Sequence, residues 1–155
     1  MTEYAELACA SNFSFLHGAS HAEELVSQAK HLGLAALAIT DRNTFAGVVR
    51  AHAAAQDMEL RFVVGVRLVV VEEMELFAWP TTRAAYGRLC RLLSLGQQRA
   101  EKGQCLLTLE DVYAHAEGSI FALPQAHMDQ LGEIKTQLKA PLYLALACRF
   151  DGQDK

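Results

Sequence analysis

Residues 4–43 read YAELACASNFSFLHGASHAEELVSQAKHLGLAALAITDRN, a pattern that predicts a strand, a long loop, a helix and a second strand. The second strand, residues 34–40, is almost entirely apolar, as expected for a strand that is buried on both faces. It ends next to Asp41. In α/β barrels the functional side chains lie where strands end. The Asp41 carboxylate is therefore the first candidate for a metal ligand or a catalytic base.

Two helices in and after this stretch carry signals for their first and last residues. Ser20 and Glu23 have the spacing of a capping box, in which each side chain hydrogen-bonds the backbone near the other residue. Gly33 is placed to end that helix. Thr44 is predicted to cap the next helix. The inner face of this second helix is expected to carry Phe45, Val48, Val49 and Ala53.

The rest of the chain continues the alternation of strands and helices. Further strands are predicted at residues 61–71, 74–79, 119–123 and 142–148. Further helices are predicted at residues 81–95, 108–115 and 128–139. The polar, glycine-flanked segment 96–105 is expected to be a mobile surface connection. This order predicts an α/β fold with a mainly parallel sheet, in which residues 61–79 form a hairpin.

The chain is expected to be one domain, residues 1–155, cut from a longer protein. A barrel needs more strands to close than this sequence supplies, so we expect an incomplete barrel. An unclosed sheet exposes an edge and apolar surface. These features predict dimerisation, aggregation or poor order near the C-terminus.

Composition narrows the function classes. The chain is 52% hydrophobic, enough for a sizeable core, and its formal net charge of −4 gives no overall attraction to nucleic acid. The N-terminus has no basic segment followed by an apolar run, so we expect no signal peptide. The apolar runs of the chain are too short to span a membrane. No two of its cysteines have CxxC spacing, so we expect reduced thiols in a cytoplasmic protein. These cysteines are Cys9, Cys90, Cys105 and Cys148.

Three segments carry a family resemblance: SNFSFLHGASHAEELV at residues 11–26, ALAITDRNTFAGVVRAH at 36–52, and AAYGRLCRLLSLGQQRAEKGQ at 84–104. They resemble the polymerase-and-histidinol-phosphatase (PHP) domain at the N-terminus of bacterial C-family DNA polymerases. More narrowly, they resemble the error-prone paralogue of the replicative alpha subunit. The resemblance runs from Tyr4 to Lys155. It implies a distorted, TIM-barrel-like (β/α) barrel with metal ligands at its strand ends.

The resemblance also implies that the metal-binding motifs are broken in this chain. Metal-binding members end the first strand in His-x-His, and the matching positions here are Ala8 and Ala10. Active members follow the second strand with Asp-His, whereas this chain has Asp41 and Arg42. A glutamate expected after the third strand is matched by Arg67. We therefore expect no metal, no cofactor and no catalytic residue in this domain, and an ion pair of Asp41 with Arg42 or Arg67.

We call the positions that match this metal site, together with the nearby His17, the remnant pocket: Ala8, Ala10, His17, Asp41, Arg42 and Arg67. Polar side chains near it can have structural roles instead of functional ones. His17, in the loop after the first strand, is the histidine placed closest to the pocket. Ser11 and Ser14 lie in the same loop without a nucleophile-elbow motif, so loop capping is their expected role. Basic residues from Arg83 to Lys102 are either solvated surface charges or contacts to DNA or to another domain.

Three functions fit these observations. The first is a degenerate, non-metal-binding domain with a structural or docking role in an error-prone DNA polymerase that acts in damage-tolerant synthesis and repair. Its expected partners are the remaining polymerase domains and other replication or damage-response proteins. DNA would be bound only through the parent polymerase. Magnesium is expected in the palm domain of that polymerase, which is absent from this chain. The second is a stand-alone metal-dependent phosphoesterase or proofreading nuclease. The third is a free-standing interaction module.

Overall fold

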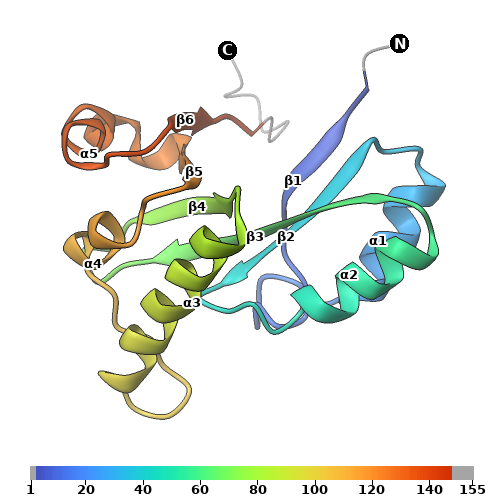
Figure 1. Ribbon diagram of the computed structural model, residues 1–155, viewed down its shortest axis with the longest axis horizontal. Helices are drawn as coiled ribbons and strands as arrows, with labels where there is room; N and C mark the ends of the chain where they lie inside the picture. Colours follow the sequence, from blue (N-terminus) through green and yellow to red (C-terminus); the bar gives the residue numbers. More distant parts are fainter. Residues whose placement is uncertain (1–2, 148–155) are drawn as a thin grey trace.

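A computed structural model describes residues 3–147 of the chain. Within these residues, six strands form one sheet in the order of the sequence (Figure 1). The strands are β1 (Ala5–Cys9), β2 (Ala36–Arg42), β3 (Arg61–Val69), β4 (Glu75–Pro80), β5 (Ser119–Pro124) and β6 (Leu142–Ala145). The helices are α1 (Ala22–His31), α2 (Val48–Asp57), α3 (Arg83–Gln98), α4 (Leu109–Ala114), the 3-10 helix η1 (Gln125–Gln130) and α5 (Leu131–Gln137).

The sheet is mainly parallel and open. β1, β2 and β3 are parallel neighbours, β4 is antiparallel to both β3 and β5, and β6 is parallel to β5. All strands except β4 therefore run in one direction and end at the same rim. β1 and β6 are the two edges of the sheet, which does not close within the described residues (Figure 1). The predicted α/β class, the β3–β4 hairpin and the incomplete barrel are confirmed.

The helices bury one face of the sheet in two apolar clusters. One cluster joins α1 and α2 to β2 and includes Val26, Ile39 and Ala51. The other joins α3, α4 and α5 to the strands β3 to β5, with Leu89 and Phe121 near its centre. These clusters fix the strands against the helices, and so fix the position of the rim where the strands end.

The opposite face, here called the inner face, carries Thr40, Arg42, Gly65, Arg67, Phe77 and Trp79. Because side chains alternate along a strand, these residues point away from the helices. The Trp79 ring on β4 stacks on Phe77 at 5.8 Å. Its Nε1–H donates to the carbonyl oxygen of Leu7 on β1, at 3.0 Å. A bond between strands this far apart in the sheet requires the sheet to curl toward the inner face.

The helix starts differ from the sequence predictions. The capping box of α1 lies one residue later than expected, since the His21 N–H donates to Glu24 Oε2 at 2.8 Å. Ser20 stays in the loop because its carbonyl oxygen accepts from the Asn12 N–H at 2.9 Å. Thr44 does not cap α2, because its hydroxyl accepts from the Ala46 N–H in a preceding turn.

The late start of α2 changes its buried face. Gly47 is the N-cap, and the buried residues are Val48, Ala51 and Ala55. Val49 and Ala53, both predicted to face the core, are exposed. Phe45 precedes the helix and packs instead against Tyr86 of α3, with ring centroids 5.0 Å apart.

Two predictions in the second half of the chain are also corrected. α3 extends to Gln98, and the buried Gly96 packs against Leu107, so segment 96–105 begins inside a helix rather than in a surface connection. The single helix predicted at residues 128–139 is η1 followed by α5. The last strand ends at Ala145, and Cys148 lies outside the described residues.

The expected apolar surface is present near the edge strand β6. Tyr143 is exposed on this strand, and Leu146, just beyond it, is 71% exposed. Exposed apolar edges favour association between chains. Dimerisation itself stays a prediction. Within the described residues, no helix has the length and apolarity that a membrane crossing requires.

Gly65 on the inner face should not tolerate a side chain. A Cβ there would lie 2.6 Å from Thr40 Cγ2 and 2.7 Å from Trp79 Cδ1. Gly65→Ala must therefore displace the indole and its bond to Leu7. Overpacking of this kind lowers the free energy of unfolding by about 1–3 kcal/mol, which urea denaturation of the purified chain measures.

The matched control is Gly87→Ala on α3, where a Cβ would have open space around it. This change is expected to raise stability by up to about 1 kcal/mol, because alanine has the higher helix propensity. Equal effects of the two substitutions would show that the indole does not occupy the space above Gly65.

Candidate functional site

A buried carboxylate lies where β2 ends. Asp41 is 1% exposed. Its Oδ1 accepts from the Ser11 N–H at 2.8 Å and from the Ser14 hydroxyl at 2.6 Å. Its Oδ2 accepts from the Ser11 hydroxyl at 2.6 Å. We call this arrangement, formed by Ser11, Ser14 and Asp41, the serine clamp.

The hydrogen bonds of the serine clamp offset the energetic cost of burying Asp41. A buried carboxylate is strongly unfavourable unless hydrogen bonds replace its hydration, and bonds to a charged acceptor are among the stronger ones. Gly47, the N-cap of α2, lies against the carboxylate, since a Cβ there would be 3.0 Å from Oδ2. The amino end of α2 therefore lies beside Asp41, where the helix dipole favours negative charge.

The same two serines shape the loop between β1 and α1. The Ser14 hydroxyl accepts from the Arg42 N–H at 3.0 Å, and the Ser11 hydroxyl accepts from the Phe13 N–H at 3.3 Å. Gly18 completes the loop, because a Cβ there would lie only 2.4 Å from the carbonyl oxygen of Ser11. The loop is thus fastened to β2 at both Asp41 and Arg42.

The predicted ion pair between Asp41 and an arginine is wrong. Arg42 follows Asp41 directly, so its side chain points to the inner face while Asp41 points to the helix side. Arg67 is the register partner of Arg42 and shares its face. Its Nη1 lies 3.7 Å from Glu75 Oε2, and its guanidinium lies 4.9 Å above the Phe77 ring.

His17 lies near the remnant pocket, as the sequence indicated. Its Nε2 lies 3.2 Å from Arg42 Nη1. Because an arginine can only donate, the ring nitrogen in this contact acts as the acceptor. His17 therefore contacts the arginine that takes the place of the family's histidine, rather than a metal ligand.

The residues around Asp41 do not fit a metal ion. Ala8 and Ala10 at the end of β1 have no donor atoms in their side chains. Burial, together with the charges of Glu6 and Asp41, raises the pKa of the Cys9 thiol, which disfavours the thiolate that a metal requires. Residues 3–147 contain no cluster of three or more histidine, cysteine, aspartate or glutamate side chains that could hold a metal. Both Asp41 oxygens already accept hydrogen bonds.

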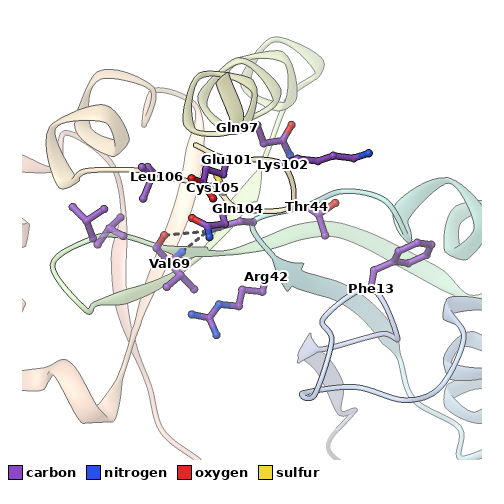
Figure 2. Close-up of a pocket in the computed structure, with 14 residues that line it drawn as sticks. Phe13, Arg42, Thr44, Val69, Gln97, Glu101, Lys102, Gln104, Cys105 and Leu106 are labelled. Carbon is purple, nitrogen blue, oxygen red and sulfur yellow. Dashed lines mark hydrogen bonds between the residues drawn. The ribbon is translucent and has the colours of Figure 1, made fainter. Parts of the chain in front are cut away.

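A pocket of about 720 Å³ lies beside the clamp, between the ends of β2 and β3 and the segment after α3 (Figure 2). Asn43, in a left-handed conformation with φ of 50°, bonds the Val69 backbone through both amide atoms at 2.9 and 3.1 Å. Lys102 and Gln104 line the side contributed by the loop. Sequence reasoning missed this pocket, although an asparagine directly after the strand end is a recognisable turn signal.

The sequence model of the PHP domain matches residues 6–148. Among curated proteins, the chain is 53% identical over 115 residues to the error-prone DNA polymerase of Rhodopirellula baltica, covering 74% of this chain and 10% of that one. It is 44% identical over 151 residues to error-prone DNA polymerase 1 of Agrobacterium fabrum, covering 94% of this chain and 14% of that one. The chain therefore spans a small part of these polymerases.

Solved structures share the fold at low sequence identity. A "putative metal-dependent phosphoesterase" from Bifidobacterium adolescentis superposes with a TM-score of 0.72 at 14% identity, over 92% of this chain and 77% of that one. An amidohydrolase from Chromobacterium violaceum, solved with bound sulfate and no metal, gives a TM-score of 0.64 at 15% identity, over 90% and 75% of the two chains. These likenesses show the fold alone, whereas the family match over residues 6–148 shows that the chain belongs to the PHP domain family.

Proposed function

We propose that this chain is a degenerate PHP domain that binds no metal and has a structural or docking role within an error-prone DNA polymerase. The observation that carries the proposal is the serine clamp. Asp41, the one acid kept from the ligand motifs, is buried and accepts three hydrogen bonds from Ser11 and Ser14. A carboxylate held in this way contributes to the fold, and both of its oxygens already accept hydrogen bonds.

The relatives support the polymerase context. The chain matches error-prone DNA polymerases over most of its own length but only 10% and 14% of theirs. We place nucleotide addition, and the magnesium ions that such a reaction uses, in regions outside this chain. The proposed partners are those regions and other replication or damage-response proteins, in a cytoplasmic enzyme that acts in damage-tolerant synthesis and repair. DNA would be bound through the parent polymerase.

The alternative is a stand-alone metal-dependent phosphoesterase or proofreading nuclease. The likeness in fold to the Bifidobacterium protein favours it. The side chains oppose it, because Ala8, Ala10 and Arg42 take the places of histidines and a catalytic metal needs several ligands. A free-standing interaction module is the third candidate, and the length of the parent reading frame separates it from the first.

Metal analysis of the purified chain tests the proposal. After dialysis against zinc or manganese and removal of free metal, we expect substoichiometric metal by mass spectrometry and no turnover of p-nitrophenyl phosphate. The physical reason is that no described cluster of side chains supplies a ligand set. One bound ion per chain together with phosphoesterase turnover would establish the enzyme instead.

A substitution at the clamp tests the structural role of Asp41. Asp41→Ala leaves the Ser11 amide and two hydroxyls without their acceptor in a buried site. A buried donor left without its acceptor typically costs about 1–3 kcal/mol of unfolding free energy, a loss measurable by urea denaturation.

Asp57→Ala is the control, because Asp57 is an exposed aspartate at the end of α2. Changes at such surface positions usually alter stability by no more than about 0.5 kcal/mol. If Asp41→Ala were as harmless as this control, the clamp would not hold the fold together.

A further inference from the structure

We propose that Arg42 and Arg67 form a phosphate-binding site on the inner face, at the rim where β2 and β3 end. The inference rests on the proposed function in one respect, since it requires the rim around these two arginines to be free of metal. The ligand would be a phosphate group bound directly by two guanidinium groups. Three observations lead to it: the placement of the two arginines, their unfilled hydrogen-bond donors, and the charges around them.

The two arginines are neighbours that should repel each other. They are register partners on adjacent parallel strands and share the inner face. Adjacent strands lie about 4.8 Å apart, and like charges directly opposite each other destabilise a sheet. An anion placed between Arg42 and Arg67 would turn this repulsion into two attractions.

Their donors are largely unused within residues 3–147. Each guanidinium has five N–H donors. For Arg42, the side-chain hydrogen bond described is the one to His17 Nε2. Arg67 Nη1 lies 3.7 Å from Glu75, beyond hydrogen-bond distance. The Nε of Arg67 is buried without an acceptor among these residues, and a buried donor without an acceptor is costly.

The surroundings favour an anion with several oxygens. Asp41 precedes Arg42 in the sequence, but it points to the other face and is held by serines. Glu75 is a single carboxylate on the far side of Arg67. A tetrahedral phosphate carries up to two negative charges and can accept from both guanidiniums at once. The Arg67 guanidinium lies over the Phe77 ring, 4.9 Å from its centroid, and this contact limits the movement of the guanidinium.

The location agrees with where ligands bind in folds of this class. Open α/β sheets bind ligands outside the carboxyl ends of their strands. Arg42 ends β2, and Arg67 lies near the end of β3. The side chains of Ala8 and Ala10 at the end of β1 carry no negative charge that would repel a phosphate.

The test is a titration of the 155-residue chain, stripped of metal with EDTA and then dialysed, with inorganic phosphate at constant ionic strength. We expect saturable, one-to-one binding by calorimetry and a rise in Tm, as for any ligand that binds the folded state. Arg42→Gln and Arg67→Gln should each weaken binding about tenfold, because each removes charged hydrogen bonds. Arg83→Gln, an exposed arginine at the start of α3, is the matched control and should leave the affinity unchanged.

Further variants and ligands keep the test decisive. Arg67→Lys keeps the charge but loses the planar fork, and should also weaken binding. If Arg67→Gln fails to fold, Arg42→Gln, whose side chain is exposed, carries the test. Thymidine 5′-phosphate and a 5′-phosphorylated oligonucleotide, titrated alongside, show whether the phosphate belongs to a nucleic acid or is a free anion, and either result supports the site.

Other outcomes would overturn the inference. One is that phosphate stabilises the double variant Arg42→Gln/Arg67→Gln as much as the unchanged chain. Another is that acetate acts as strongly as phosphate at the same ionic strength. Either result would show an unspecific salt effect. Failure of the metal-free chain to bind phosphate contradicts this inference alone, whereas stoichiometric metal in the protein before EDTA treatment contradicts the proposed function. Phosphate binding that requires added zinc contradicts both.

Discussion

The hydrogen bonds between Asp41 and the two serines of the β1–α1 loop are the interactions on which this rim of the fold depends. They join a loop to a buried strand across about thirty positions of sequence. Because Asp41 is buried, hydrogen-bond donors must replace the water that would otherwise surround its carboxylate. The donors in turn set the path of the loop, because Ser14 also accepts from the backbone of Arg42. One carboxylate therefore determines where His17, Arg42 and the start of α2 lie.

Under the proposed function, this arrangement accounts for how the rim keeps its shape without a metal. Here the helix side of the rim is held by neutral hydroxyls and an amide around Asp41. The inner side is held by an indole that spans from β4 to β1 and by an arginine stacked on Phe77. The proposed structural role of Asp41 and the proposed phosphate site rest on this separation of the two faces. Asp41 lies on the helix side, and the two arginines lie on the inner face.

Much of the architecture could be predicted from the sequence because strand and helix periodicities are local properties. The near-continuous apolar run before Asp41 identified β2, and the Glu72–Glu73 break identified the β3–β4 hairpin. Helix starts were predicted less well. Ser20 and Thr44 have the chemistry of caps, but tertiary contacts of the loop and a local turn use them elsewhere. Asp41 lies about thirty positions from the two serines in the sequence, so their meeting depended on loop geometry that no local signal describes.

The failed ion pair between Asp41 and an arginine has a simple cause. Charge complementarity suggested the pair, but alternation along β2 places residues 41 and 42 on opposite faces, and the register places Arg67 with Arg42. The alternation of side chains along a strand can be read from the sequence, and it predicts that residues 41 and 42 point to opposite faces although they are adjacent. The remnant pocket is thus two separate environments, one of which is the buried clamp.

The claim that Asp41 is a structural anchor and not a metal ligand can be tested by nuclear magnetic resonance with paramagnetic Mn²⁺. A bound ion broadens the amide signals of the residues around it. Because the serines hold Asp41, we expect low concentrations of Mn²⁺ to leave the signals of Ser11, Ser14 and Arg42 as sharp as those of the distant helix α3. Selective broadening centred on Asp41 would show that an ion displaces the serines, and would contradict the account.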